Sequence, residues 1–403
     1  MYQLLEKLFV DATRLTQSVQ LTEVPAALQR ALESVAGADG ARPAAAMGVV
    51  LDTPRIGFST AAPAMPLRGG PDVPAARTPV RRSARPAGMS APGAPRATFA
   101  EGSFTGRTET RTYKLFVPAA AVDRGPPLIV MLHGCSQSPD DFATGTRMNE
   151  IAQERGFLVL YPAQAPRSNG SRCWNWFLPG DQRRGSGEPE VLAAMTRDVM
   201  TRHGVDPNRV YIAGLSAGGA MADIMGREYP DLYAAVGVHS GVPQGAAHDA
   251  SSAFTVMRNG AASNGSQAGA PGGPTTLRRR SKGVRLGTRQ AAAIVFHGDR
   301  DDTVHPSNGE EVIGALLQAA GGTARIAATT EKASNAGRAV TRTVHRRAPA
   351  TPEEPSLAEH WIVHGAGHAW SGGSTRGSFT DAAGPDATRE MVRFFEEHPL
   401  RPA

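Results

Sequence analysis

Hydrophobic residues recur at helical intervals at the start of the chain. Leu4, Leu8 and Leu15 follow this spacing, and Thr22 has a side chain suited to cap a second short helix. The pattern predicts a helical segment over residues 1–36.

The pattern then changes twice. Residues 37–100 keep neither a helical nor a strand period and are rich in Pro, Ala and Gly, which predicts a flexible linker. Over residues 101–399, short β-like runs alternate with helical ones, which is typical of the α/β class: a mostly parallel sheet with helices on both faces. The stretch 245–290 interrupts the alternation and is predicted to be a loop or cap insertion.

The predicted elements of this domain are short. The strands are Thr112–Val117, Leu128–Leu132, Phe157–Tyr161, Arg209–Ala213, Ala234–Val238, Ala292–Phe296 and His360–Val363. The helices are Met148–Glu154, Glu188–His203, Ala217–Tyr229, Asn308–Ala319 and Asp386–Glu397.

Composition adds limits on the class of protein. Hydrophobic residues make up 40% and charged residues 20% of the 403 positions, as in globular proteins, while 45 Gly and 31 Pro indicate much loop. No apolar run is long enough for a spanning helix, so no transmembrane segment is expected. The N-terminus has no basic region followed by an apolar core and a cleavage site, which favours a cytoplasmic location.

The net charge of +6 comes with two basic clusters, within residues 68–96 and 278–289. Neither cluster is interleaved with aromatic residues that would stack on bases. We interpret both as solvated basic loops and expect no nucleic-acid partner.

The most informative segment places a serine between a strand and a helix. The apolar run ends in Gly214-Leu215-Ser216-Ala217-Gly218, and small residues follow at helical spacing. A sharp strand-to-helix turn exposes such a serine, and glycines two positions to either side let the strand and helix approach closely. Ser216 is therefore the predicted nucleophile.

A serine hydroxyl needs a histidine to accept its proton and a carboxylate to orient that histidine, in the chain order Ser, Asp, His. After the strand that ends at residue 296 come Asp299, Asp301 and Asp302, and spacing alone leaves all three open. Further on, His368 lies in a glycine-rich loop and is the predicted base, whereas His364 at the strand end is predicted to be structural.

A metal site is the competing interpretation of the same segments. His297 and His305 flank the three acids, but their spacing matches no compact ligand motif. His364 and His368 are separated by glycines that disfavour a ligand-bearing helix. We expect no metal.

The tetrahedral intermediate of acyl transfer needs two N–H donors. Position predicts the backbone N–H groups of Ala217, which begins the helix, and Cys135, which lies in the turn after the strand Leu128–Leu132. The only other cysteine is Cys173, and the sequence leaves a disulfide between the two open.

Two of the four tryptophans, Trp174 and Trp176, lie in the run CWNWF, and a third, Trp370, follows the predicted base by two positions. They are interpreted either as a hydrophobic clamp under a loop or as a substrate-binding wall for an acyl chain. We carry the substrate-binding interpretation forward.

Seven ordered motifs, LHGCSQSPDDFATGTRMNEIA, FLVLYP, CWNWF, GVDPNRVYIAGLSAGGAMA, GVHSGVP, HGDRDDTV and GAGHAWSGG, resemble the polyhydroxybutyrate depolymerase family of esterases over about residues 101–399. The resemblance implies an α/β-hydrolase fold and hydrolysis of ester bonds without a metal or organic cofactor. It places the nucleophile at Ser216, the base at His368 and the acid at Asp301. Asp299 and Asp302 then become neighbours that would raise the pKa of Asp301 unless other groups compensate.

The resemblance implies poly(3-hydroxybutyrate)-type polyester or its oligomers as the ester substrate, and an extracellular location as the alternative to a cytoplasmic one. Because related sequences include feruloyl and acetylxylan esterases, a carbohydrate esterase is the first alternative function. A catalytically silent protein that binds polymer granules is the second, and a peptidase is the third.

Overall fold

The computed structural model describes residues 96–107, 109–119, 125–261, 290–321, 326–334, 337–350 and 354–400. The helical segment predicted over residues 1–36 and the linker predicted over residues 37–100, apart from its last five residues, lie outside this part of the chain.

The described residues form one alternating series of strands and helices. In chain order they are β1 (Thr98–Thr105), β2 (Thr110–Val117), β3 (Leu128–Leu132), α3 (Pro139–Thr146), α4 (Met148–Arg155), β4 (Leu158–Pro162), the 3-10 helix η1 (Pro179–Gln182), α5 (Gly187–His203), β5 (Val210–Leu215), α6 (Ala217–Glu228), β6 (Ala235–His239), α7 (Ala250–Asn259), β7 (Ala292–Gly298), α8 (Ser307–Ala319), β8 (Ile326–Ser334), β9 (Ala339–Arg347), β10 (Ala358–Val363), β11 (Trp370–Ser371), β12 (Thr380–Asp381) and α9 (Ala387–Glu397).

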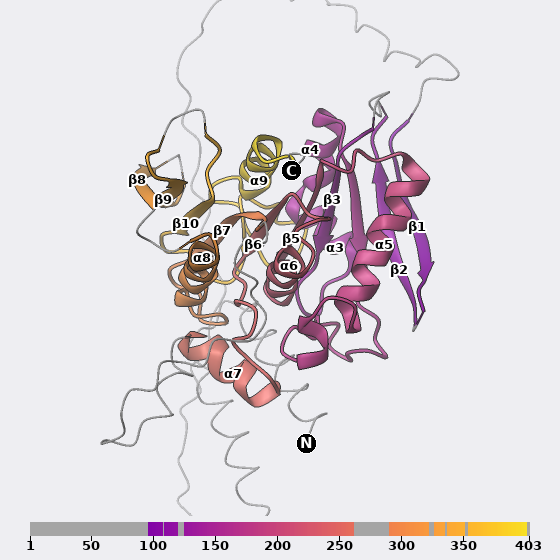
Figure 1. The fold of residues 1–403 in the computed structure, drawn as a ribbon, viewed down its shortest axis with the longest axis horizontal. Helices are drawn as coiled ribbons and strands as arrows, with labels where there is room; N and C mark the ends of the chain where they lie inside the picture. The colour runs from indigo at the N-terminus through magenta and orange to yellow at the C-terminus, as the bar shows by residue number, and fades with distance from the viewer. Residues whose placement is uncertain are drawn as a thin grey trace, which may run out of the picture. The chain divides into compact units, whose positions relative to one another are not determined.

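Ten strands form the central sheet, in the order β1-β2-β4-β3-β5-β6-β7-β10-β9-β8. Neighbouring strands pair in parallel along the stretch β4-β3-β5-β6-β7-β10. At the two edges, β1, β2, β8 and β9 join by antiparallel pairing. Figure 1 shows these edges on opposite sides of the molecule. The carboxyl ends of the parallel strands consequently meet along one side of the sheet, where loops can gather functional side chains.

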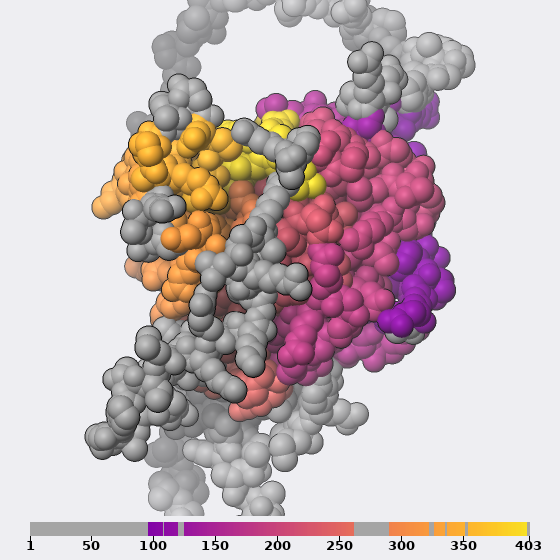
Figure 2. Space-filling view, viewed as in Figure 1, coloured from indigo at the N-terminus to yellow at the C-terminus, as the bar shows by residue number. Residues whose placement is uncertain are grey.

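Side chains alternate between the two faces of the sheet and form two separate cores. In β3, Leu128 and Val130 belong to one core with residues of α5, α6 and α8, while Ile129 and Met131 belong to the other with residues of α3, α4 and α9. Burial on both faces explains why this strand is a continuous apolar run. Figure 1 shows α5 and α6 in front of the sheet, and in the space-filling view of Figure 2 the sheet is hidden on this side.

All seven predicted strands and all five predicted helices are present, with ends within two residues of the prediction. The linker prediction is wrong at its end, because β1 begins at Thr98. Sequence patterns also missed α3, α7, β8 and β9. In β8 nearly every side chain is exposed, so there is no apolar alternation to detect.

Within the predicted insertion over residues 245–290, α7 lies in the described part, while residues 262–289 lie outside it. Among the described helices, none combines the length and apolar character that crossing a bilayer requires.

Candidate functional site

Ser216 occupies the tight turn between β5 and α6. Its backbone has φ 58° and ψ −121°, a conformation that a non-glycine residue adopts only under constraint. A Cβ on Gly214 would lie 2.3 Å from the carbonyl carbon of Gly218, and a Cβ on Gly218 would lie 2.1 Å from the carbonyl oxygen of Leu132. Both glycines are therefore required for the close packing that presents the serine.

Asp301 lies in the loop after β7 and is 4% exposed. One carboxylate oxygen accepts the N–H groups of Thr303 (3.0 Å) and Val304 (2.8 Å), and the other is 2.7 Å from Nδ1 of His368. Burial alone would raise the pKa of Asp301, but the charge and hydrogen bonds of His368 and His297 outweigh burial and hold this pKa well below its usual range.

The other two acids of this loop do not reach His368. Asp299 is 2.8 Å from Nδ1 of His364 and accepts the N–H of Gly365, and Asp302 is exposed. The upward pKa shift anticipated for Asp301 is absent because the charge and hydrogen bonds of His368 and His297 outweigh burial. His364 also contacts Thr341, as expected for a structural histidine.

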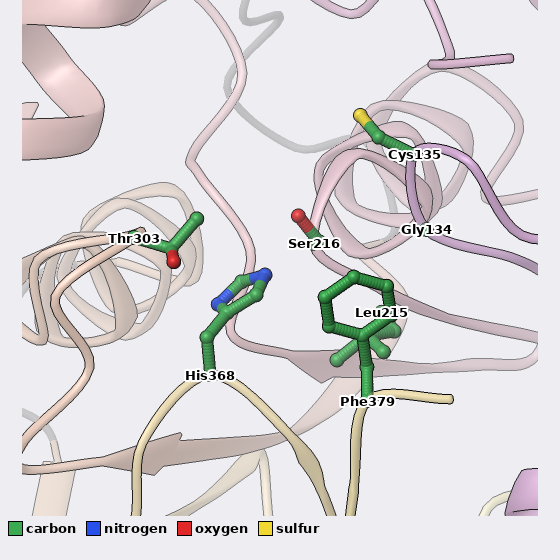
Figure 3. Close-up of a pocket in the computed structure, with 7 residues that line it drawn as sticks. All are labelled: Gly134, Cys135, Leu215, Ser216, Thr303, His368 and Phe379. Atoms are coloured by element: carbon green, nitrogen blue, oxygen red, sulfur yellow. The ribbon is translucent and has the colours of Figure 1, made fainter. Parts of the chain in front are cut away.

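A narrow pocket brings the predicted nucleophile and base together. Its lining residues are Gly134, Cys135, Leu215, Ser216, Thr303, His368 and Phe379. Figure 3 shows the Ser216 hydroxyl and one ring nitrogen of His368 pointing toward each other. Within the described residues Ser216 and His368 share no hydrogen bond, a looseness common in sites without substrate.

The two predicted oxyanion donors lie at the Ser216 end of this pocket. Ala217 is the first residue of α6, so its N–H has no acceptor within the helix. The N–H of Cys135 likewise has no acceptor in the described part of the chain. Cys135 is disulfide-bonded to Cys173, which joins its turn to the loop after β4. The sequence alone did not decide whether this disulfide forms.

The structure does not place the predicted substrate-binding tryptophans at this pocket. Trp174, Trp176 and Trp370 are 0%, 4% and 1% exposed, and none of them lines the pocket. The indole N–H of Trp174 donates to the carbonyl of His133, and that of Trp370 donates to the hydroxyl of Thr388. These rings fill the hydrophobic cores beneath the site, which agrees with the alternative interpretation, a hydrophobic clamp under a loop.

Two residues around the site were missed from sequence. His297, at the end of β7, lies 2.8 Å from the Val304 carbonyl and 3.4 Å from Asp301 Oδ2. Phe379 lines the pocket from a loop more than 150 residues from Ser216, and no local pattern marks it. In the described residues, no group of His, Cys, Asp and Glu is arranged to hold a metal ion.

A mostly parallel sheet with a serine at the strand-to-helix turn after β5 defines the α/β-hydrolase fold. The chain belongs to the family described as Esterase PHB depolymerase, which matches residues 111–341. Six of the seven motifs lie within the matched residues, and the seventh, GAGHAWSGG, follows them in the chain.

Two relatives and one solved structure illustrate the similarity. Poly(3-hydroxyalkanoate) depolymerase C from Paucimonas lemoignei is 33% identical over 243 residues, covering 60% of this chain and 54% of that protein, so the chain spans about half of its length. Feruloyl esterase B from Thermothelomyces thermophilus is 32% identical over 200 residues, covering 49% of this chain and 67% of that protein. An acetyl xylan esterase from Aspergillus awamori, 18% identical, shares the fold with a TM-score of 0.53 over 74% of this chain and 99% of its own.

Proposed function

We propose that this chain is a carboxylic ester hydrolase that works through an acyl-enzyme on Ser216. The observation that carries the proposal is the single pocket in which the Ser216 hydroxyl faces His368, which is itself paired with the buried Asp301. His368 takes the proton of Ser216 as the hydroxyl attacks the ester carbonyl, and Asp301 orients and stabilises the imidazolium. His368 then protonates the leaving alcohol.

The backbone N–H groups of Cys135 and Ala217 stabilise the oxyanion, aided by the positive end of the α6 dipole. Water repeats the attack on the acyl-enzyme and releases the acid. No step requires a metal or organic cofactor.

We propose a poly(3-hydroxybutyrate)-type polyester or its oligomers as substrate. The similarity to a poly(3-hydroxyalkanoate) depolymerase supports this class. A cavity of about 540 Å³ also lies along the turn that follows Cys135, lined by Gln137, Ser138 and Arg172 among others. Its lining residue His133 directly precedes Gly134, which lines the Ser216 pocket, and the cavity offers room for further units of an oligomer. The similarity to a feruloyl esterase supports the alternative, a hydroxycinnamoyl or acetyl ester on carbohydrate.

Hydrolysis of p-nitrophenyl butyrate by purified protein tests the activity. We expect Ser216→Ala to lower kcat by at least about 10³-fold with an unchanged thermal unfolding profile, and to abolish labelling by a fluorophosphonate. Near-normal turnover in Ser216→Ala would reject Ser216, and an unlabelled, inactive but folded wild type would favour the silent granule-binding protein. Release of soluble acids from polyester, compared with methyl ferulate and acetylated xylan, separates the substrates.

A further inference from the structure

The pocket at Ser216 is closed on one side by Phe379. This ring lies edge-on to His368, with 6.5 Å between ring centroids, and Figure 3 shows it beside Leu215 and Ser216. The free volume of the pocket is only about 10 Å³, about one water-sized group. Phe379 is one of the apolar walls that limit this volume.

Phe379 is held in a backbone conformation that a large side chain avoids. Its φ is 52°, so surrounding contacts must fix it there. Its carbonyl accepts the N–H of Trp370 at 2.7 Å. One residue earlier, the N–H of Ser378 donates to Oδ1 of Asp141 in the first turn of α3 at 2.9 Å.

The same loop packs against α3 without space between them. A Cβ on Gly377 would lie 2.4 Å from the Cα of Gly145, and the N–H of Ser374 donates to the Gly145 carbonyl at 2.8 Å. Contact between backbones leaves the loop little freedom to shift relative to the helix.

One buried side chain joins this loop to the turn that carries Cys135, one of the two proposed oxyanion donors. Gln137, 3% exposed, accepts the N–H of Gly134 at 2.9 Å through its amide oxygen. Its amide nitrogen donates to Oδ2 of Asp141 at 2.9 Å and to the carbonyl of Ser378 at 3.1 Å. An amide is the side chain that can accept on one side and donate twice on the other.

We propose that Phe379 determines which acyl groups the site accepts, favouring short unbranched ones over long ones, and that Gln137 is a positioning residue that keeps Phe379 in register with the Gly134–Cys135 turn. The inference rests on the proposed ester hydrolysis at Ser216. The acyl group stays bonded to Ser216 through both half-reactions, so the apolar wall beside that serine contacts it whichever alcohol leaves.

Enlarging the pocket tests the role of Phe379. With p-nitrophenyl acetate, butyrate, hexanoate and octanoate, we expect Phe379→Ala to raise the octanoate-to-butyrate ratio of kcat/KM at least about tenfold, since one methylene in a pocket changes kcat/KM by about 10–200-fold. Phe99→Ala is the matched control. Phe99 lies on the edge strand β1 and packs against Tyr161, so its substitution should leave the octanoate-to-butyrate ratio unchanged.

An unchanged octanoate-to-butyrate ratio in an active Phe379→Ala protein overturns the assignment. A second series, acetate esters of different alcohols, varies the leaving group instead. A change in kcat/KM confined to this second series also overturns the assignment. If the alanine variant unfolds, the octanoate-to-butyrate ratio is measured in Phe379→Leu, which is a smaller change. Failure of the proposed function looks different: wild type would then hydrolyse none of the esters, or Ser216→Ala would hydrolyse them normally.

Gln137→Glu tests the positioning role by pH. A protonated Glu can replace the acceptor and one donor, whereas an ionised one has no donor and faces Asp141. We expect the kcat of the variant, relative to wild type, to fall about tenfold or more as pH rises from 5 to 8, with the octanoate-to-butyrate ratio rising in parallel. Adding Asp141→Asn supplies an amide donor to the new carboxylate and should restore both values at pH 8. A pH-independent ratio to wild type would reject the role.

Discussion

Asp301 is an ionised carboxylate at a position that water hardly reaches. Two backbone N–H groups hold one of its oxygens, which leaves the other for His368. The low pKa of Asp301 means that it stays charged while His368 gains and loses a proton. Its expected contribution is thus to fix the tautomer of His368 and to stabilise the imidazolium.

Asp301→Asn removes the charge and keeps the shape. We expect kcat for p-nitrophenyl butyrate to fall by about 10³–10⁴-fold with little change in KM, because orientation and charge matter most in the transition state. Asp299→Asn is the matched control, since Asp299 contacts His364 at the surface and should change kcat by less than about threefold. A larger loss in Asp299→Asn than in Asp301→Asn would assign the acid differently.

Single residues were predictable where a local rule constrains them. Ser216 could be found because a sharp turn demands small neighbours, and the order of Asp301 and His368 follows from strands that end at the same side of the sheet. Their catalytic roles stay predictions. Trp174 and Phe379 show the limit: whether an aromatic ring fills a core or faces a pocket depends on residues far away in the chain.

The segment between β4 and α5 is a long loop held by one buried carboxylate. Glu188, in the first turn of α5, accepts the backbone N–H of Asn175 at 2.8 Å and hydrogen bonds to the side chain of Gln164. Arg111 lies 3.7 Å away. Because the loop also contains Cys173, Glu188 helps to fix the chain behind the oxyanion turn.

Glu188 should make stability depend on pH. Burial raises the pKa of Glu188 from 4.5 to about 7, so the folded protein binds this proton more tightly than the unfolded chain. Unfolding then releases the proton, and the Glu188 contribution to the free energy of unfolding falls as pH rises from 4.5 to about 7, by about 3 kcal/mol. In urea unfolding at several pH values, the free energy of unfolding of wild type minus that of Glu188→Gln should fall by this amount over the same range, whereas a simple loss of contact with Arg111 would shift the difference by a constant. A difference that does not change with pH would contradict the assignment.

Elements were predictable where burial imposes a period. β3 and β5 are buried on both faces and read as apolar runs, and α5 begins with acids and ends at Gly204. The sequence of α3, PDDFATGT, is a poor helix former, and its start depends on the Ser138 cap and Pro139. β9 is the only described strand that pairs with β8, and no pattern within the residues of β8 reveals this pairing.

At the scale of the whole molecule, burial holds three of the described histidines in the neutral state. His133 directly follows β3, His239 ends β6 and His360 lies within β10. Burial lowers the pKa of His133 and His360 to about 4 and that of His239 to about 3, from the ordinary 6.5. The Nε2 atoms of His133 and His239 accept backbone N–H groups from Gln164 and Ser371, at 3.1 and 3.0 Å. A proton on either nitrogen would break that hydrogen bond and leave a buried charge.

These histidines should make the protein labile to acid. Between pH 6.5 and about 4 the unfolded chain binds protons that the folded histidines refuse, so the free energy of unfolding decreases as pH falls. At pH 5.5 these three histidines take up protons on unfolding while Glu188 releases one, so these four groups together contribute a net uptake of about two protons and a slope of about 3 kcal/mol per pH unit. The lowered pKa values of His203, His345 and His398 act in the same direction. Urea unfolding at closely spaced pH values measures this slope directly. A free energy of unfolding that stays level or increases as pH falls from 6 to 5 would mean that these histidines are not held neutral.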